Sequence, residues 1–356
     1  MSSTYYKYPA SDVHIHAVTR AFADETLNMV QELGYEKFLM LSAASALPEF
    51  MGNNLLCASV KLKSRGKGYA FAALHYPETG TESPEALLAQ AALYHELGFD
   101  GIKMMDGKPN IRLRIGVPLD DPVFDPLFSF MESMDFPLLY HVNDPIEFWT
   151  WELMPQWAKS RGNDVFYGDG RYPSKQQIED EAVSILKKHP KLRVIFPHFF
   201  FTATSLERTK ELFDTYPNLN YDITPGWEMF ESFAGDYDLW RQFFIAYSTR
   251  ILFGTDTISD HWRETVHALR RVLETGEPFT AFEENCRGLN LEGMPLRNIY
   301  QNNFDRYLPV PPRKMNLAGL KAYGQSLYPR AATLKTDRAE KAAANIAEAL
   351  AALEAL

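Results

Sequence analysis

Near the start of the chain, the residues from Ser11 to Val18 alternate polar and apolar side chains. An alternation of period two is typical of a strand, and it places Asp12, His14 and His16 on the same side. Two imidazoles and a carboxylate are costly to bring together unless something occupies the space between them. Neutral imidazole nitrogens are good ligands for zinc and similar divalent ions, so this strand indicates a metal site. The alternative is one solvated face of an edge strand.

Seven more short apolar stretches follow, and helical patterns separate most of them. The eight predicted strands lie at residues 11–18, 37–42, 68–75, 99–104, 137–141, 192–198, 219–224 and 250–256. Helices are predicted at residues 23–33, 83–97, 121–134, 175–188, 205–216 and 239–247, and a polar loop at 43–67. This alternation predicts an α/β fold with a parallel sheet, and eight repeats predict a (β/α)8 TIM barrel. An open doubly wound sheet is the alternative, but no Gly-x-Gly-x-x-Gly loop follows the first strand.

The chain has 356 residues, a usual length for such a barrel with additions. We expect the barrel at residues 1–308, with a long loop after strand five. A C-terminal helical extension is expected at residues 309–356, because Pro309 to Pro312 break the chain. Within it, Ile346, Leu350 and Leu353 recur at helical spacing. They predict packing on the barrel or on a partner subunit.

Charge and composition exclude several classes of partner. The net charge is −10 and there is no basic block, which argues against nucleic acid and anionic membranes as partners. Two widely separated cysteines indicate a reducing compartment. The first residues do not resemble a signal peptide, and there is no apolar run of ~18 residues. We therefore expect a soluble cytoplasmic protein.

Side chains that can bind metals end several of the predicted strands. In a barrel, catalytic groups lie at the C-terminal ends of the strands. The residues at these ends are His16, His75, Lys103, His141, His198 and Asp256. One histidine at such a position is more often structural, but several coordinating groups are hard to explain by chance. The combined pattern favours a metal centre.

These motifs, taken in order, identify a family resemblance. They are Asp12-x-His14-x-His16, Gly101-Ile-Lys103, Asp121-Pro122 through Phe136–His141, His189–His198, Tyr216–Asp222, Leu252–Asp256 and Tyr300–Leu308. From about residue 12 to residue 308, the chain resembles the amidohydrolase-2 (amidohydrolase-related) family of the amidohydrolase superfamily. That family includes aminocarboxymuconate-semialdehyde decarboxylase and other aromatic-acid decarboxylases.

The resemblance implies a set of ligands and catalytic groups. One divalent ion, zinc or manganese, would be held by His14, His16, His141 and Asp256. His198 would be a catalytic base or orienting group, and Asp256 would also transfer a proton. Phe199 to Phe201 replace the glycines usual after this histidine, which should narrow the pocket.

Lys103 ends the strand where binuclear relatives carry a carbamylated lysine. It could therefore support a second metal, or act as the charge partner of a carboxylate in the site or in the substrate.

The insertion after the fifth strand is the best indication of the substrate. It is unusually aromatic, and a long loop in a compact domain is more often functional than decorative. With arginines nearby, aromatic walls suit a flat, unsaturated or aromatic carboxylate. The predicted substrate-binding residues are Lys103, His75, Trp149, Trp151, Arg161 and Arg171, with Arg112 and Arg114 as further candidates for binding an anion. Alternatively, the tryptophans pack against outer helices or a second subunit.

We expect a metal-dependent hydrolase that acts on a small, cyclic or unsaturated carboxylate. Metal-activated water would attack a carbonyl, with Asp256 and His198 in proton transfer. Hydrolysis is placed first because hydrolytic chemistry is broad across the superfamily, which is an argument by analogy. The alternative is non-oxidative decarboxylation of an aromatic or unsaturated acid. A second alternative is an inactive metal-binding barrel, although such a chain would be expected to have lost His198 or Asp256. The expected partners are the small-molecule substrate and further copies of the chain in a homo-oligomer.

Overall fold

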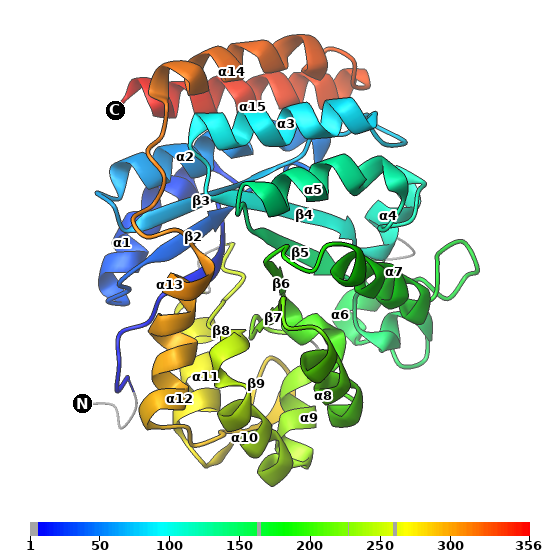
Figure 1. The fold of residues 1–356 in the computed structure, drawn as a ribbon, viewed down its shortest axis with the longest axis vertical. Coiled ribbons are helices and arrows are strands. Elements are labelled where there is room, and N and C mark those ends of the chain that lie inside the picture. The colour runs from blue at the N-terminus through cyan, green and yellow to red at the C-terminus, as the bar shows by residue number, and fades with distance from the viewer. Residues whose placement is uncertain (1–5, 162–164, 227, 259–261) are drawn as a thin grey trace.

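The computed structural model describes residues 6–161, 165–226, 228–258 and 262–356. At its centre is an eight-stranded parallel sheet in which each strand pairs with the next one along the chain (Figure 1). A bridge between Ile15 and Thr257 brings the first strand to the segment after the last. The sheet is thereby nearly closed, and the predicted (β/α)8 barrel is confirmed. The strands are β1 (Asp12–His16), β2 (Phe38–Leu41), β3 (Gly68–Ala73), β4 (Gly101–Gly107), β5 (Leu138–Val142), β6 (Val194–Phe196), β7 (Leu219–Asp222) and β8 (Ile251–Leu252).

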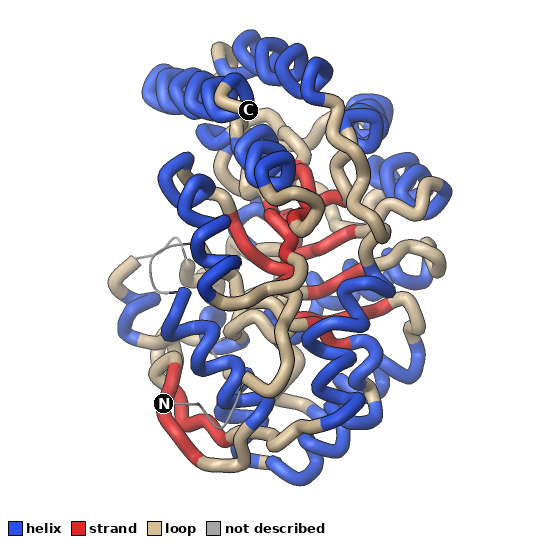
Figure 2. The backbone as a smooth tube through the Cα atoms, turned by 90° about the vertical axis from the view of Figure 1, so that its left-hand side faces the viewer, coloured by secondary structure: helices blue, strands red, loops and turns tan. Residues whose placement is uncertain are grey.

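Helices surround the strands, as the view turned by 90° also shows (Figure 2). The α-helices are α1 (Arg20–Glu32), α2 (Asn53–Lys63), α3 (Pro84–Leu97), α4 (Pro109–Ile115), α5 (Asp125–Ser133), α6 (Gln156–Lys159), α7 (Lys175–Lys188), α8 (Leu206–Thr215), α9 (Met229–Gly235), α10 (Tyr237–Ala246), α11 (Trp262–Glu274), α12 (Gly293–Arg297), α13 (Asn303–Tyr307), α14 (Leu317–Ala331) and α15 (Thr336–Glu354). Single turns are η1 (Pro48–Phe50), η2 (Pro122–Phe124), η3 (Ile146–Trp149), η5 (His198–Phe201), η6 (Ser248–Arg250) and the wider turn η7 (Asn298–Asn302).

Local sequence explains where the helices begin and end. The Ser83 hydroxyl accepts the amide N–H of Ala86 at the start of α3, and Pro84 occupies the first helical position. The helix ends at Gly98, whose φ of 93° favours glycine. A Cβ at Gly98 would also lie 2.2 Å from the carbonyl oxygen of Lys314. This glycine therefore lets the segment before α14 pass close to the end of α3.

The interior of the barrel is apolar at its base and polar at its rim. One buried cluster joins inward-facing strand residues to two side chains of α13 and to the residue that follows this helix. It comprises Val13, Leu39, Leu41, Tyr69, Phe71, Leu139, Ile195, Leu252, Phe304, Tyr307 and Leu308. The Tyr307 hydroxyl also donates to the carbonyl oxygens of Leu138 and Arg193 at the base of β5 and β6. Along β5, side chains alternate, so His141 points the same way as Leu139. The base is thus closed by α13, and the polar groups lie at the opposite end.

The structure adds elements that the sequence did not predict, among them a buried helix and a hairpin. Residues 43–67 were expected to form a loop, but α2 occupies Asn53–Lys63 and is buried from Asn53 to Lys61. An antiparallel hairpin of β9 (Pro278–Ala281) and β10 (Glu284–Arg287) follows α11.

The C-terminal extension lies against α2 and α3, on the outside of the barrel (Figure 1). The division into domains at residue 308 stays a prediction. None of the helices in the described part of the chain combines the length and the apolar character that a membrane-spanning helix needs.

Candidate metal centre

A cavity of about 470 Å³ opens at the rim of the barrel. Every strand-end side chain of the prediction except His75 lines it, together with His14. His14 and His16 come from β1, and Asp256 follows β8. The amide N–H of His16 donates to the carbonyl oxygen of Thr257 at 2.9 Å, so the bridge that nearly closes the barrel also brings these side chains together.

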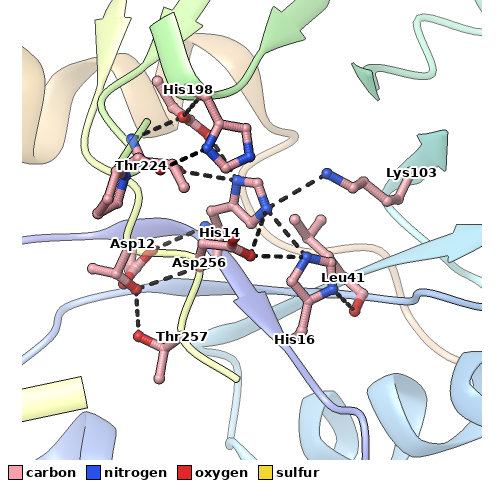
Figure 3. A network of polar contacts seen from close by, with 12 residues as sticks. Asp12, His14, His16, Leu41, Lys103, His198, Thr224, Asp256 and Thr257 are labelled. Carbon is pink, nitrogen blue, oxygen red and sulfur yellow. Dashed lines mark hydrogen bonds and ion pairs between the residues drawn. The ribbon is translucent and has the colours of Figure 1, made fainter. Parts of the chain in front are cut away.

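Three potential ligand atoms converge at the base of this cavity (Figure 3). The Nε2 atoms of His14 and His16 are 3.2 Å apart. The Oδ1 atom of Asp256 lies 3.4 Å from the first and 3.3 Å from the second. Lys103 brings its Nζ atom to 3.5 Å from Nε2 of His14.

The hydrogen bonds of the other ring nitrogens determine the protonation of these atoms. Nδ1 of His16 lies 3.0 Å from the carbonyl oxygen of Leu41, which can only accept. Nδ1 of His14 lies 2.9 Å from Oδ2 of Asp222. With both Nδ1 atoms as donors, each neutral ring carries its lone pair on Nε2. Two lone pairs and a carboxylate oxygen therefore face one another, and this donor set fits a divalent cation.

Asp12 lies on the strand with the two histidines, but its carboxylate has another role. Its Oδ1 accepts the backbone N–H of His14 at 2.9 Å, and its Oδ2 accepts the hydroxyl of Thr255 at 2.7 Å. Asp12 therefore holds the backbone of β1 against the segment that carries Asp256.

His141 lies outside the group of three converging ligand atoms. Its Nε2 is 3.0 Å from the carbonyl oxygen of Asn143, so Nδ1 is the nitrogen left to carry the lone pair. Its ring centroid is 4.8 Å from that of His198, on the wall of the same cavity. The predicted role of His141 as a fourth ligand stays a prediction.

His198 begins a left-handed turn. The φ angles from His198 to Phe201 are 55°, 54°, 57° and 51°, a region that costs side-chain-bearing residues ~1–2 kcal/mol each. Aromatic packing offsets this cost: Phe199 stacks on Phe244, and Phe200 stacks on Phe196 with centroids 4.3 Å apart. Of the three phenylalanines, Phe201 lines the cavity, and its ring stacks on His198.

Burial and neighbouring charges set the protonation of the site. Burial lowers the pKa of His141 and of His198 to about 4, and holds that of His14 well below its usual value. Burial alone would raise the pKa of Asp256, but the nearby His14 and His16 outweigh it and hold the pKa well below the usual value. Burial also lowers the pKa of Lys103 to about 8. Neutral imidazoles and an ionised carboxylate are the forms that bind a metal.

The predicted substrate-binding residues of the insertion fall into two groups. Arg161 lines the cavity and lies over the ring of Trp157, which also lines it. Trp149, Trp151 and Arg171 are not among the described residues that line the cavity. Their side chains respectively donate to the carbonyl oxygen of Pro173, pack against Phe166, and pair with Asp169.

Three other candidate contacts make structural interactions away from the cavity. Nε2 of His75 is 2.7 Å from the hydroxyl of Tyr323 in α14, so this histidine connects the extension to the end of β3. Arg112 forms a buried ion pair with Glu181. Arg114 donates to the carbonyl oxygens of Ser45 and Ala46. None of these three is among the described residues that line the cavity, so they are not part of the proposed site.

Several residues that line the cavity are not among those predicted from the sequence. Lys108 lines the wall and pairs with Asp144 at 2.6 Å, and the hydroxyl of Tyr167 donates to the same carboxylate. Phe282 and Glu283, at the tip of the hairpin, also line the cavity. Asp144 directly precedes the aromatic insertion in the sequence, and this position could have identified it as a cavity residue. The hairpin is remote from any predicted strand end, so only the fold brings its tip to the rim.

Solved structures with similar folds support the barrel architecture. An uncharacterised TIM-barrel protein from Bordetella bronchiseptica aligns with a TM-score of 0.53 at 14% identity, covering 88% of this chain and 99% of its own. A 2,6-dihydroxybenzoate decarboxylase aligns with a TM-score of 0.53 at 15% identity, over 84% and 98%. The IDCase of Metarhizium anisopliae aligns with 0.52 at 15%, over 85% and 97%. At these identities, the likeness shows the fold alone.

A comparison with curated proteins finds no match. The family model described as amidohydrolase matches residues 41–343. The match spans most of the chain and includes Lys103, His141, His198 and Asp256, although it begins after β1. This chain therefore belongs to the amidohydrolase family.

Proposed function

We propose that this protein is a metal-dependent enzyme that hydrolyses a C–O or C–N bond in a small, cyclic or unsaturated carboxylate. The observation that carries the proposal is the convergence of Nε2 of His14, Nε2 of His16 and Oδ1 of Asp256, all of them lone-pair donors. With His141 as the fourth ligand, they would hold one divalent ion, zinc or manganese. Such an ion supplies Lewis-acid chemistry, since it polarises a carbonyl and lowers the pKa of water, to ~7 with zinc.

Asp256 and His198 are placed to accept a proton at the rim. The carboxylate of Asp256 faces the cavity, and its side chain is 37% exposed. Nδ1 of His198 donates to the carbonyl oxygen of Pro225 at 2.9 Å, so Nε2 is the accepting nitrogen. Hydrolysis needs such an acceptor for the proton of water, and the same group can return the proton to the leaving group.

The cavity walls support a flat substrate with an acidic group. The apolar lining consists of Met105, Pro145, Phe148, Trp157, Val165, Phe201, Pro225 and Phe282. Three cationic side chains line the same space: Lys103 at the metal end, with Lys108 and Arg161. Aromatic walls with cations suit a planar carboxylate.

The same walls favour a second candidate, the non-oxidative decarboxylation of an aromatic or unsaturated acid. That reaction places a proton on the carbon that loses CO2. Asp256 or His198 would then have to be protonated before the step. Hydrolysis is placed first because hydrolytic chemistry is broad across the superfamily. The homo-oligomeric state and the cytoplasmic location stay predictions.

Metal analysis and product analysis test this proposal together. We expect one tightly bound divalent ion per chain by elemental analysis, and loss of activity in chelator that the metal restores. His14→Ala should lose both the ion and the activity while its circular dichroism stays native, because the rim contributes little to the core. A matched control is His267→Ala, a histidine exposed on α11.

The reaction would be identified on a panel of lactones, amides and aromatic acids. Uptake of one water without gas supports hydrolysis, and release of CO2 overturns it in favour of decarboxylation. Full activity without a stoichiometric metal would contradict both reactions. Two ions per chain would instead indicate a second metal supported by Lys103.

A further inference from the structure

Asp222, the last residue of β7, is a fully buried carboxylate beside the candidate metal centre. Its Oδ1 accepts the backbone N–H groups of His198 at 3.1 Å and Thr224 at 3.0 Å. Its Oδ2 lies 2.9 Å from Nδ1 of His14. One side chain therefore contacts a candidate ligand on β1 and the residue that starts the left-handed turn after β6.

We infer that Asp222 is a positioning residue that selects the tautomer of His14 and thereby keeps the lone pair of Nε2 turned toward the metal centre. This inference rests on the proposed metal function. In its ionised form the carboxylate of Asp222 can only accept hydrogen bonds, and this form sets their direction. Nδ1 of His14 must then carry the proton. The hydroxyl of Thr224, 3.1 Å from the same Nδ1, is compatible with that direction because it can also accept.

The arrangement requires a carboxylate, and an amide of the same shape would reverse it. In Asp222→Asn, the amide oxygen satisfies the two backbone N–H groups, and the NH2 group faces Nδ1 of His14. Nδ1 must then become the acceptor, which moves the ring proton to Nε2 and removes the lone pair from the metal centre. The opposite orientation of the amide would place the NH2 group against two N–H donors, which is unfavourable.

There is also little free space around the carboxylate of Asp222. A Cβ at Gly254 would lie 3.1 Å from Oδ2 of Asp222 and 2.8 Å from the hydroxyl oxygen of Thr224. The φ of Gly254 is not in the left-handed region, so this glycine is required by the available space and not by its conformation. We expect Gly254→Ala to displace the carboxylate of Asp222 while leaving its charge and its hydrogen-bonding groups unchanged.

The first experiment measures zinc affinity by competition with a chromogenic chelator. Loss of a group that orients a metal ligand typically weakens metal binding by about 10–100-fold, and we expect Asp222→Asn to fall in this range. Gly254→Ala should weaken binding in the same direction. The matched control is Glu284→Gln: Glu284 is also a buried carboxylate that accepts two backbone N–H groups, from Phe230 and Glu231, but it does not contact the candidate ligands. A folded Asp222→Asn variant with unchanged zinc affinity would overturn the inference.

The second experiment reads the tautomer directly and needs no metal. Long-range 1H–15N correlation spectra of the metal-free wild-type protein should show His14 protonated at Nδ1, with the signal assigned by its loss in His14→Ala. Protonation at Nε2 would overturn the inference. In Asp222→Asn the proton should move to Nε2, a change that a general loss of stability does not produce. If the wild type shows the expected tautomer but binds no zinc, the metal function fails while the tautomer assignment stands.

Discussion

Single buried carboxylates connect segments of this protein that are far apart in sequence. Asp222 at the end of β7 contacts His14 on β1, and Asp12 holds β1 to Thr255. Outside the barrel, the carboxylate of Glu284 in the hairpin accepts the backbone N–H groups of Phe230 and Glu231 and so connects the hairpin to α9. At the scale of the residue, the arrangement of the rim therefore depends on the protonation of a few side chains.

The pH dependence of stability should report on Glu284. Burial raises its pKa from 4.5 to about 8, more than the two amide N–H groups lower it. Because the folded state then binds the proton more tightly than the unfolded state, the contribution of Glu284 to stability is complete below about pH 4.5 and is lost as the pH rises through 8. The loss should be on the order of a few kcal/mol. Denaturant titrations across this range should show a smaller decline for Glu284→Gln than for the wild type. Equal declines in both proteins would show that Glu284 does not titrate in this way.

At the scale of the element, the aromatic insertion after β5 behaves as a small unit with its own core. Phe148, Met154, Ala158 and Tyr167 form a separate buried cluster. The hydroxyl of Tyr167 reaches Asp144, beside His141, so the unit is attached directly to the rim. The tryptophans of this insertion lie in different surroundings: Trp157 lines the cavity, whereas Trp149 and Trp151 do not line it among the described residues. The sequence alone does not distinguish them.

Replacing Trp157 and Trp151 separately should distinguish a tryptophan that contacts the substrate from one that does not. Trp157 lines the cavity, whereas Trp151 is 41% exposed and packs on Phe166. With a substrate identified from the panel, Trp157→Ala should raise KM about tenfold, corresponding to a lost contact of ~1.4 kcal/mol. Trp151→Ala is the matched control and should leave KM unchanged. Equal effects of the two substitutions would mean that the insertion acts as a whole and not through a wall residue.

At the scale of the whole molecule, the C-terminal extension packs against the outer helices of the barrel. The stripe predicted from Ile346, Leu350 and Leu353 is buried. The hydroxyl of Tyr323 contacts His75 and accepts from Asn54 of α2. The extension therefore covers apolar surface and also satisfies polar groups behind β3.

A chain that ends at residue 308 should accordingly lose stability. Its removal uncovers buried faces of α2 and α3, so we expect a melting temperature lowered by at least several degrees or an aggregated product, read by calorimetry and light scattering. Removing only Ala355 and Leu356, which follow the end of α15, is the control and should change neither. An unchanged melting temperature for the shortened chain would instead identify residues 309–356 as an independent unit.

The sequence predicted the barrel well because each parallel strand is a short apolar run that ends in a polar side chain. It failed for α2, since the helix begins with Asn53 and Asn54, a pair typical of loops. Both are buried here, and the side chain of Asn54 forms hydrogen bonds with Ala73 of β3. The polar strand ends also identified residues of the candidate metal centre, but His75 has the same position at a strand end and contacts Tyr323 instead. Which tryptophan faces the cavity, and where the hairpin tip lies, depend on packing between distant segments. A single sequence does not contain that information.

The order in which the chain is made has a consequence for the metal centre. His16 and Asp256 are brought together where Ile15 meets Thr257, so two candidate ligands come from opposite ends of the barrel sequence. During synthesis, His14 and His16 emerge more than two hundred residues before Asp256 does. The complete set of ligands cannot exist until the eighth strand has left the ribosome and docked against the first. Tight binding of the proposed ion by all of these residues would therefore require a finished barrel.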